Sequence, residues 1–299
     1  MQVSRVRLWI LGFILMLYLA GVLVLSAVTL YEPKDTKASK FVMEQKQISK
    51  KLDYGISTYH SSKRFKIDWC KNLEFQRPAK SPVALASFPG SGNTWLRYLL
   101  QQATGLYTGS VYKDYGLLKS GFPAESVSNG SVLVVKTHEW GANSRKMFTK
   151  AVLLVRAPAP AIQAEFNRQS GGHIGFASPD RYKKTRGRYW QQFVADKLKM
   201  WKQMNLDWLY NFTGPTHVIF YEQLVDNVRH TLTVLLNFLE VPISDNLLMC
   251  ALERQEGIYR RKKRYPNFDP FTPGMKKMLQ REQKKVYDAI YNVASPARR

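Results

Sequence analysis

The segment between Val83 and Arg97 constrains the fold of this 299-residue chain more than any other part. Its first residues, VALAS, predict a short buried strand, the following FPGSG predicts a tight turn, and a helix capped by Asn93 or Thr94 comes next. This order brings several backbone N–H groups and the positive end of a helix dipole to one point, which favours binding of a phosphate. An ordinary strand–turn–helix corner is the alternative interpretation.

The turn differs from the loop of nucleoside triphosphatases. Those proteins carry a lysine directly before a serine or threonine, as in GxxxxGK[ST], and it contacts the β- and γ-phosphates. This chain has no lysine at that place. The sequence therefore predicts a loop that holds one terminal phosphate without acting on it.

Composition indicates the kind of partner. The chain has 45 Lys and Arg against 22 Asp and Glu, a formal net charge of +23, and 45% of its residues are hydrophobic. The hydrophobic content is typical of a globular protein and excludes a chain that is disordered throughout. The charge predicts an acidic partner, which leaves a polyanionic cofactor, an anionic glycan, a nucleic acid and a phospholipid surface open.

The N-terminal region predicts a membrane anchor. Residues 8–31 contain no charge over 24 positions, and a bilayer core requires about 20 apolar residues. A cleaved signal peptide is the alternative, although its apolar region usually has only about 7 to 15 residues. Arg5 and Arg7 favour an N-terminus in the cytosol. We therefore expect a single-pass type II membrane protein whose bulk lies in the secretory lumen.

This topology divides the chain into a cytosolic stub at 1–7, a transmembrane signal-anchor at 8–31, a stem at 32–65 and a lumenal domain at 66–299. A membrane anchor with a lumenal domain argues against nucleic acid as the partner. Two N-x-[ST] sequons, at Asn129 and Asn211, are the expected glycosylation sites. The oligomeric state is not predicted.

Only two cysteines occur, Cys70 and Cys250, so a four-cysteine zinc site is excluded. In an oxidising compartment the two would form one bridge, and otherwise both would be buried thiols that pack as small hydrophobes. No spacing in the sequence requires a metal.

Strand and helix patterns alternate from Val83 onward, which predicts an α/β fold with a parallel sheet flanked by helices. The expected strands are 83–87, 132–135, 151–155 and 216–221. The expected helices are 94–103, 160–169, 189–210, 224–240 and 276–293. In 189–210 the aromatic residues recur every three or four positions, which indicates a core-facing helix.

Four segments, in this order and spacing, resemble the sulfotransferase superfamily over most of 83–293. FPGSGNTW, residues 88–95, stands where that family has its 5′-phosphosulfate loop, commonly YPKSGTTW. LLVRAP, with Arg156, stands where an R-[DN]-P segment binds the 3′-phosphate. VVKTH is similar to the segment that supplies a catalytic histidine, here His138, and VIFYEQL, with Tyr221, resembles the strand and turn that follow.

The resemblance implies a P-loop-like phosphosulfate loop and the sulfuryl donor 3′-phosphoadenosine 5′-phosphosulfate (PAPS), with no metal. The cofactor-binding residues it implies are Gly90, Ser91, Gly92, Asn93, Thr94, Trp95, Arg156, Tyr221, Arg260, Arg261 and Lys262. Arg260, Arg261 and Lys262 belong to a basic run where the family has an R-K-G segment, and a solvated charged surface is the alternative for them. A surface position and a strand-end ion pair are the alternatives for His138 and Arg156.

More narrowly, FPGSGNTWLR and AEFNR, residues 164–168, resemble the WSC-domain-containing sulfotransferase-like family. Its members are proposed to act on sialylated glycans in the Golgi, which implies a glycan or glycoprotein acceptor and a location in the Golgi membrane here. Members often carry cysteine-rich WSC modules, and a chain with two cysteines has none.

Two positions depart from the superfamily pattern. Gly90 replaces a Lys or Arg that neutralises the bridging oxygen of the donor, and Ala164 replaces a Ser that binds the 3′-phosphate. Loss of the cation removes electrostatic stabilisation of the leaving group. We expect Lys136 to supply that charge, because it precedes His138 by two residues on a strand, and Arg168 to contact the 3′-phosphate. A non-catalytic receptor of anionic glycans is the alternative function.

A second basic run, residues 181–189, interleaves cations with tyrosines, and we expect it to form a loop. Such a surface fits an acidic sugar through charge and stacking.

Overall fold

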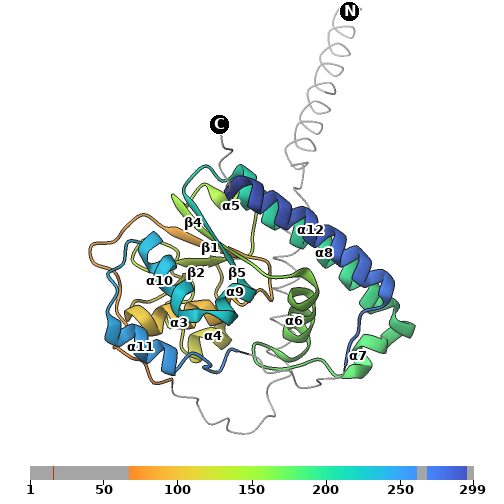
Figure 1. Ribbon diagram of the computed structural model, residues 1–299, viewed down its shortest axis with the longest axis horizontal. Helices are drawn as coiled ribbons and strands as arrows, with labels where there is room; N and C mark the ends of the chain where they lie inside the picture. Colours follow the sequence, from red (N-terminus) through yellow and green to blue (C-terminus); the bar gives the residue numbers. More distant parts are fainter. Residues whose placement is uncertain (1–15, 17–66, 261–267, 295–299) are drawn as a thin grey trace, which may run out of the picture. The chain divides into compact units, whose positions relative to one another are not determined.

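The computed structural model describes Met16 and residues 67–260 and 268–294 (Figure 1). The chain separates into two compact units, Met1–Ser62 and Lys63–Arg299. Of the first unit only Met16 is described, so the predicted signal-anchor at 8–31 and the stem lie outside the described residues. Within the described part, the helices fall short of the length and apolar character that a bilayer span requires.

The second unit is built on a parallel sheet of five strands in the order β2-β3-β1-β4-β5. The strands are β1 (Val83–Ser87), β2 (Gly109–Ser110), β3 (Val135–Thr137), β4 (Lys150–Val155) and β5 (Thr216–Phe220). The predicted α/β class and parallel sheet are confirmed. The chain leaves β1 toward β3 and later returns to β4 on the other side, so β1 is the topological switch point of the sheet.

The bounds predicted for the second strand, 132–135, are wrong. Leu133 and Val134 lie before the strand but still bond to the segment of β2, since Leu133 N–H donates to Tyr107 O and Gly109 N–H donates to Val134 O. The strand itself is β3, which places the charged Lys136 at its centre. The two residues of β2 were not predicted, because so short a strand leaves no periodic pattern.

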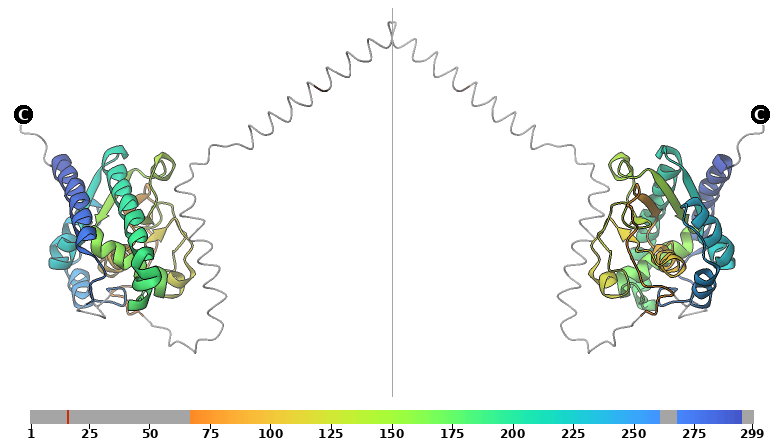
Figure 2. Two further views of the ribbon diagram at one scale, coloured as in Figure 1. Left: turned by 90° about the vertical axis from the view of Figure 1, so that its right-hand side faces the viewer. Right: turned by 90° about the vertical axis from the view of Figure 1, so that its left-hand side faces the viewer.

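Alternate side chains of the strands point to opposite faces of the sheet, each covered by helices. Ala84, Ala86 and Leu153 pack on one face, and Leu85, Val152 and Leu154 pack on the other. The first face is covered by α6 (Pro158–Gly171), α8 (Arg188–Asn211) and α12 (Pro273–Ala294), and Figures 1 and 2 show α8 and α12 side by side. The second is covered by α3 (Asn93–Thr104), α10 (Val228–Phe238) and α11 (Asp245–Glu253).

The helix predicted at 224–240 is in fact two helices, α9 (Tyr221–Asp226) and α10. Asn227 separates them, because its backbone is not helical (φ −143°, ψ 79°) and its side chain accepts the N–H of His230 at 3.0 Å as an N-cap. The short helices α4 (Tyr115–Lys119), α5 (Ala142–Arg145), α7 (Pro179–Lys183) and η1 (Lys184–Gly187) were not predicted, nor was α11.

The alternative left open for the cysteines is settled in favour of the bridge. Cys70 and Cys250 form a disulfide with their Cα atoms 6.0 Å apart. It joins the segment before β1 to α11, across 180 residues of sequence.

Candidate functional site

The loop between β1 and α3 is held in place by two glycines in the left-handed region. Gly90 has φ +85°, and a Cβ there would lie 2.3 Å from the backbone oxygen of Ala161 and 2.9 Å from the nitrogen of Glu165 on α6. Gly92 has φ +97°, and a Cβ there would lie 2.5 Å from the ring of Tyr221. Both positions therefore require glycine, and a lysine side chain has no room at position 90.

The first turn of α3 presents backbone amides beside this loop. The first intrahelical bond runs from Leu96 N–H to Gly92 O at 2.9 Å, so the amides of Asn93, Thr94 and Trp95 have no intrahelical partner. The expected cap by Asn93 or Thr94 is wrong, because Gly92 is the N-cap and no side chain caps the helix. The side-chain amide of Asn93 instead points toward β1, where its Nδ2 donates to Leu85 O at 3.0 Å.

Polar atoms beneath the loop lack partners. Ser91 is 1% exposed and Asn93 is 4% exposed, and neither Ser91 Oγ nor Asn93 Oδ1 has a hydrogen bond within the described residues. Unpaired buried polar atoms are costly, and they are often found where a ligand binds. The Ser91 hydroxyl and the free backbone amides at the start of α3 can donate to a bound anion, whereas Asn93 Oδ1 can only accept a hydrogen bond.

Arg156, the residue directly after β4, contacts the same loop. Its Nη1 donates to Gly90 O at 2.9 Å, and its guanidinium carbon lies 4.2 Å from the centre of the Tyr221 ring. Burial lowers the pKa of Arg156, and its Nε has no hydrogen bond in the described structure. Tyr221 also contacts the indole of Trp95 edge-on at 5.8 Å. The residues predicted from three separate motifs thus meet at one loop.

Trp95 itself supports the loop from inside the fold. It is 2% exposed, and its Nε1 donates to the backbone oxygen of Gln255 at 2.7 Å. The guanidinium carbon of Arg260 lies 5.1 Å from the Trp95 ring, so this predicted residue does reach the helix that follows the loop. Arg261 and Lys262 lie outside the described residues.

His138 lies just beyond the carboxyl end of β3, next to the end of β1. Its Nδ1 is 2.6 Å from the backbone oxygen of Ser87, a pure acceptor, so Nδ1 carries the proton and Nε2 carries the lone pair. His138 is 8% exposed, and burial, followed by the charge of Lys136, lowers its pKa to about 3. The imidazole is therefore neutral at neutral pH.

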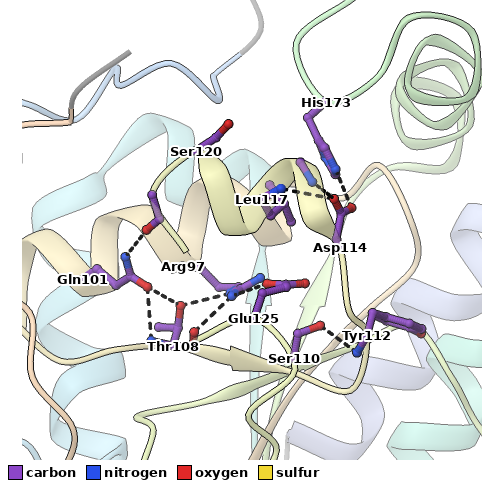
Figure 3. Close-up of polar contacts among 12 residues, drawn as sticks. Arg97, Gln101, Thr108, Ser110, Tyr112, Asp114, Leu117, Ser120, Glu125 and His173 are labelled. Atoms are coloured by element: carbon purple, nitrogen blue, oxygen red, sulfur yellow. Dashed lines mark hydrogen bonds and ion pairs between the residues drawn. The ribbon is translucent and has the colours of Figure 1, made fainter. Parts of the chain in front are cut away.

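Lys136 is a buried cation without a carboxylate partner in the described structure. It is 6% exposed, and burial lowers its pKa. The nearby acids are engaged elsewhere, since Glu125 forms an ion pair with Arg97 at 2.8 Å and Asp114 binds His173 at 2.7 Å (Figure 3). An uncompensated buried ammonium is costly, and it indicates that a negative charge binds there.

Tyr112 links Lys136 to His138, and no motif in the sequence indicated it. Its hydroxyl accepts the backbone N–H of His138 at 3.0 Å. Its ring stacks on that of His138, 5.8 Å between centres and 26° between planes, and lies 5.6 Å from the amine of Lys136. Lys136 and His138 were expected to share one side of a strand that continues to His138; β3 ends at Thr137, but both side chains lie near the Tyr112 ring. Tyr112 follows the two-residue β2, which sequence patterns do not detect.

Arg168 and Ala164 lie on α6, next to the loop. The Cβ of Ala164 would be 3.2 Å from a Cβ at Gly90, so a small residue fits here. Arg168 forms two hydrogen bonds with the fully buried Glu165, at 2.6 and 2.7 Å, which together with Lys197 hold the pKa of that carboxyl at about 2 against the cost of burial. The charge of Arg168 also contributes to lowering the pKa of His138.

The remaining predicted positions lie at the surface. Residues 181–189 do not form the expected loop but belong to α7, η1 and the start of α8, because Pro179 starts a helix and Tyr182 is buried beneath it. Asn129 and Asn211 are both exposed. No group of three or more His, Cys, Asp or Glu side chains within the described ranges is arranged to hold a metal.

Comparison with solved structures finds only low similarity. One of these structures is a mouse sulfotransferase, SULT7A1, complexed with PAP, the 3′,5′-bisphosphate that remains when PAPS loses its sulfuryl group. It has a TM-score of 0.47 at 13% identity, and the match covers 71% of this chain and 89% of the sulfotransferase chain. Retinol dehydratase in complex with androsterone and the inactive cofactor PAP has a TM-score of 0.42 at 13% identity, covering 73% and 82%.

Comparison of sequences gives much stronger matches, although no model of a known protein family matches the chain. A WSCD family member from Aedes aegypti is 50% identical over 95% of this chain and 96% of its own length. One from Drosophila pseudoobscura pseudoobscura is 49% identical over 92% and 94%, and one from Drosophila melanogaster is 63% identical over 70% and 66%. The chain belongs to the WSCD family.

Proposed function

We propose that this protein transfers a sulfuryl group from PAPS to a hydroxyl of a glycan. The observation that carries the proposal is the position of His138, with its Nε2 lone pair available, beside the unneutralised Lys136. Both lie at the carboxyl edge of the sheet with the β1–α3 loop, where open α/β sheets bind their ligands. The motif resemblance to PAPS-dependent sulfotransferases supports the choice of donor.

The residues divide the reaction between them. The amides at the start of α3 and Arg156 hold the phosphates of the donor. The acceptor oxygen attacks the sulfur in line, and a new S–O bond forms as the bond from sulfur to the phosphate oxygen breaks. The hydroxyl proton passes to Nε2 of His138, and the electron pair of the broken bond leaves on PAP, where Lys136 stabilises the charge.

The low pKa of His138 fits this role only when the donor is bound. A pKa of about 3 makes a weak base; burial is the larger cause of this low pKa, and the positive charge of Lys136 is the second. A polyanionic donor next to Lys136 offsets that charge and raises the pKa of His138 toward its ordinary value. The proposal therefore includes activation of the base by donor binding.

We also propose that the domain works in the Golgi lumen as a type II membrane protein, with a glycan or glycoprotein as acceptor. The Cys70–Cys250 disulfide supports an oxidising compartment, since such bonds are rare in the cytosol. Exposure of both sequon asparagines, Asn129 and Asn211, is compatible with glycosylation. The exposed cations of residues 181–189 fit an acidic acceptor.

The second candidate is a receptor that binds PAP and anionic glycans without turnover. It is favoured by Gly90, because the close approach of α6 excludes the cation that the superfamily has at this position. The enzyme needs Lys136 to replace that charge, whereas the receptor does not.

One experiment separates the two candidates. The full-length protein, purified in detergent, is incubated with radiolabelled PAPS and a panel of sialylated and neutral glycans, and PAP binding is measured in parallel by thermal shift. The enzyme moves label to an acceptor and loses this activity in Lys136→Ala. Tight PAP binding with no transfer to any glycan establishes the receptor, and absence of PAP binding contradicts both.

A further inference from the structure

Lys136 shares one face of the sheet with a buried ion pair. The strand register places it beside Leu85 of β1 and Ser110 of β2, and register partners in parallel strands point their side chains to the same face. Leu85 packs on the face that α3 covers. The side chain of Lys136 therefore enters the layer between the sheet and α3, where Arg97 of α3 pairs with Glu125 at 2.8 Å (Figure 3).

We propose that Glu125 is a positioning residue of the candidate site: Arg97 holds its carboxylate in place, and the carboxylate keeps the Lys136 ammonium group charged. The inference rests on the proposed function, which takes Lys136 as the cation that stabilises the charge left on PAP. A neutral amine cannot stabilise that charge. Glu125 acts through Lys136 and not on the donor itself.

Arg97 is fixed by contacts that do not involve a ligand. Its Nε donates to Thr108 Oγ1 at 3.0 Å, and its Nη2 donates to Thr108 O at 3.1 Å. Its guanidinium carbon lies 4.3 Å from the centre of the Phe122 ring. The backbone N–H of Glu125 donates to Phe122 O at 3.0 Å, so the residue that supports the guanidinium also fixes the turn that carries the carboxylate. The ion pair is thus held by the fold.

Burial makes this carboxylate effective on its neighbours. The side chains of Arg97 and Glu125 are both 0% exposed, and charges interact more strongly in such surroundings than in water. Glu125 Oε1 has no hydrogen bond within the described residues. A buried carboxylate oxygen without a donor is costly, and a nearby ammonium group offsets part of that cost. The charged form of Lys136 and the buried Glu125 therefore stabilise each other.

Glu125 has the largest effect among the charges around Lys136. Burial lowers the pKa of the Lys136 amine, Glu125 raises it, and Arg97 lowers it by less than Glu125 raises it. Loss of the Glu125 charge should therefore favour the neutral amine. The other titratable groups around Lys136 in the described structure are Asp114, before α4, Arg168, on α6, and the neutral Tyr112 and His138.

The test follows the pH dependence of PAP binding to the full-length protein in detergent, by calorimetric titration. The affinity should fall above the pKa of Lys136, because the neutral amine no longer attracts the anion. In Glu125→Gln we expect this fall about one pH unit lower, the smaller end of the range for one opposite charge nearby. Glu253→Gln is the matched control, since Glu253 is exposed at the end of α11, and it keeps the wild-type profile.

Two double variants separate this role from a purely structural one. Lys136→Arg added to Glu125→Gln should remove the alkaline loss, because a guanidinium stays charged. Arg97→Gln added to Glu125→Gln leaves neither partner of the ion pair as a lone buried charge. It should still lower the midpoint, since Glu125 outweighs Arg97 at Lys136, and it tests the inference even if Glu125→Gln alone does not fold.

The possible outcomes are distinct. The inference is overturned, and the proposed function is not, if Glu125→Gln weakens PAP binding equally at every pH or if its profile coincides with that of the wild type. Absence of PAP binding by the wild type overturns the proposed function, and with it the role of Lys136.

Discussion

The two sides of the site differ in how completely they are satisfied. On the donor side, the β1–α3 loop is wedged between α6 and Tyr221, and Arg156 is already bonded to Gly90 O. On the β3 side, Lys136 is buried without a counter-ion in the described structure, and His138 has a pKa of about 3. The first side is stabilised by close packing, whereas the second keeps an electrostatic cost that only a ligand relieves.

The difference shows how a site can carry its positive charge on a neighbouring strand, at Lys136, when the loop has glycine at position 90. Close approach of α6 requires glycine at position 90, and this removes the charge from the loop. Lys136, on the neighbouring strand β3, places a charge at the same edge of the sheet at the cost of burying it. Under the proposed function, close packing of the loop and the charge of the site then depend on two different residues, Gly90 and Lys136.

The largest expected effect comes from removing the base. His138→Ala should lower sulfuryl transfer by about 10² to 10⁴ fold, because general base catalysis contributes that much, while PAP affinity stays nearly unchanged. The control is His230→Ala, since this exposed histidine lies on α10, away from the site. Initial rates with labelled PAPS measure the effect. Full activity in His138→Ala contradicts the role of the base but not the donor site.

The donor side is tested through the packing of its loop. Gly90→Ala should destabilise the fold by about 2 to 5 kcal/mol, the sum of left-handed strain and a forced backbone shift. Gly187→Ala carries the strain alone, because Gly187 has φ +80° with nothing within 4 Å of its Cβ position, and should cost only about 1 to 2 kcal/mol. Denaturant unfolding measures both. If the two variants lose the same free energy of unfolding, α6 moves to accommodate the added Cβ, and close packing does not fix the loop.

Some elements were predictable because they repeat a pattern that burial requires. The helix expected at 189–210 is α8 to within one residue at each end, since Trp190, Trp201 and Trp208 all face the core. The strand expected at 83–87 is β1 without change. The loop after it followed from its glycines, although the side chain of Asn93 had to be seen in place to show that it bonds to β1.

Other features depend on contacts between distant residues. A buried lysine contradicts a hydropathy pattern, so β3 was predicted to start three residues and to end two residues too early. Tyr112 gains its importance only from contact with His138, 26 residues later. The disulfide remained open for the same reason, because proximity of Cys70 to Cys250 is a property of the fold and not of their spacing.

A smaller effect is expected for the contact of the donor with Arg156. Arg156→Ala should weaken PAP binding by roughly 1.5 to 3 kcal/mol, the range for a hydrogen bond to a charged group, and should remove most of the preference for PAP over AMP. Calorimetric titration with both nucleotides measures it. An unchanged ratio of the two affinities would mean that the bond to Gly90 O is the whole function of Arg156, which then only supports the loop.

The smallest expected effect is a pH dependence of stability that arises from His138, on the β3 side. The pKa of His138 is about 3 in the folded protein against an ordinary 6.5, so below pH 6.5 the unfolded chain binds a proton that the folded protein does not. Stability must then fall as the pH falls through this window, by about 1.4 kcal/mol between pH 5.5 and 4.5. A glutamine at position 138 does not titrate, so the stability of His138→Gln should fall less by that amount over the same interval. The difference between variant and wild type cancels the contributions of the other groups.

Saturating PAP should shrink this difference in stability, because an anion beside Lys136 raises the pKa of His138 toward its unfolded value. A difference that PAP leaves unchanged would show that the donor does not reach Lys136, and activation of the base by donor binding would then be wrong.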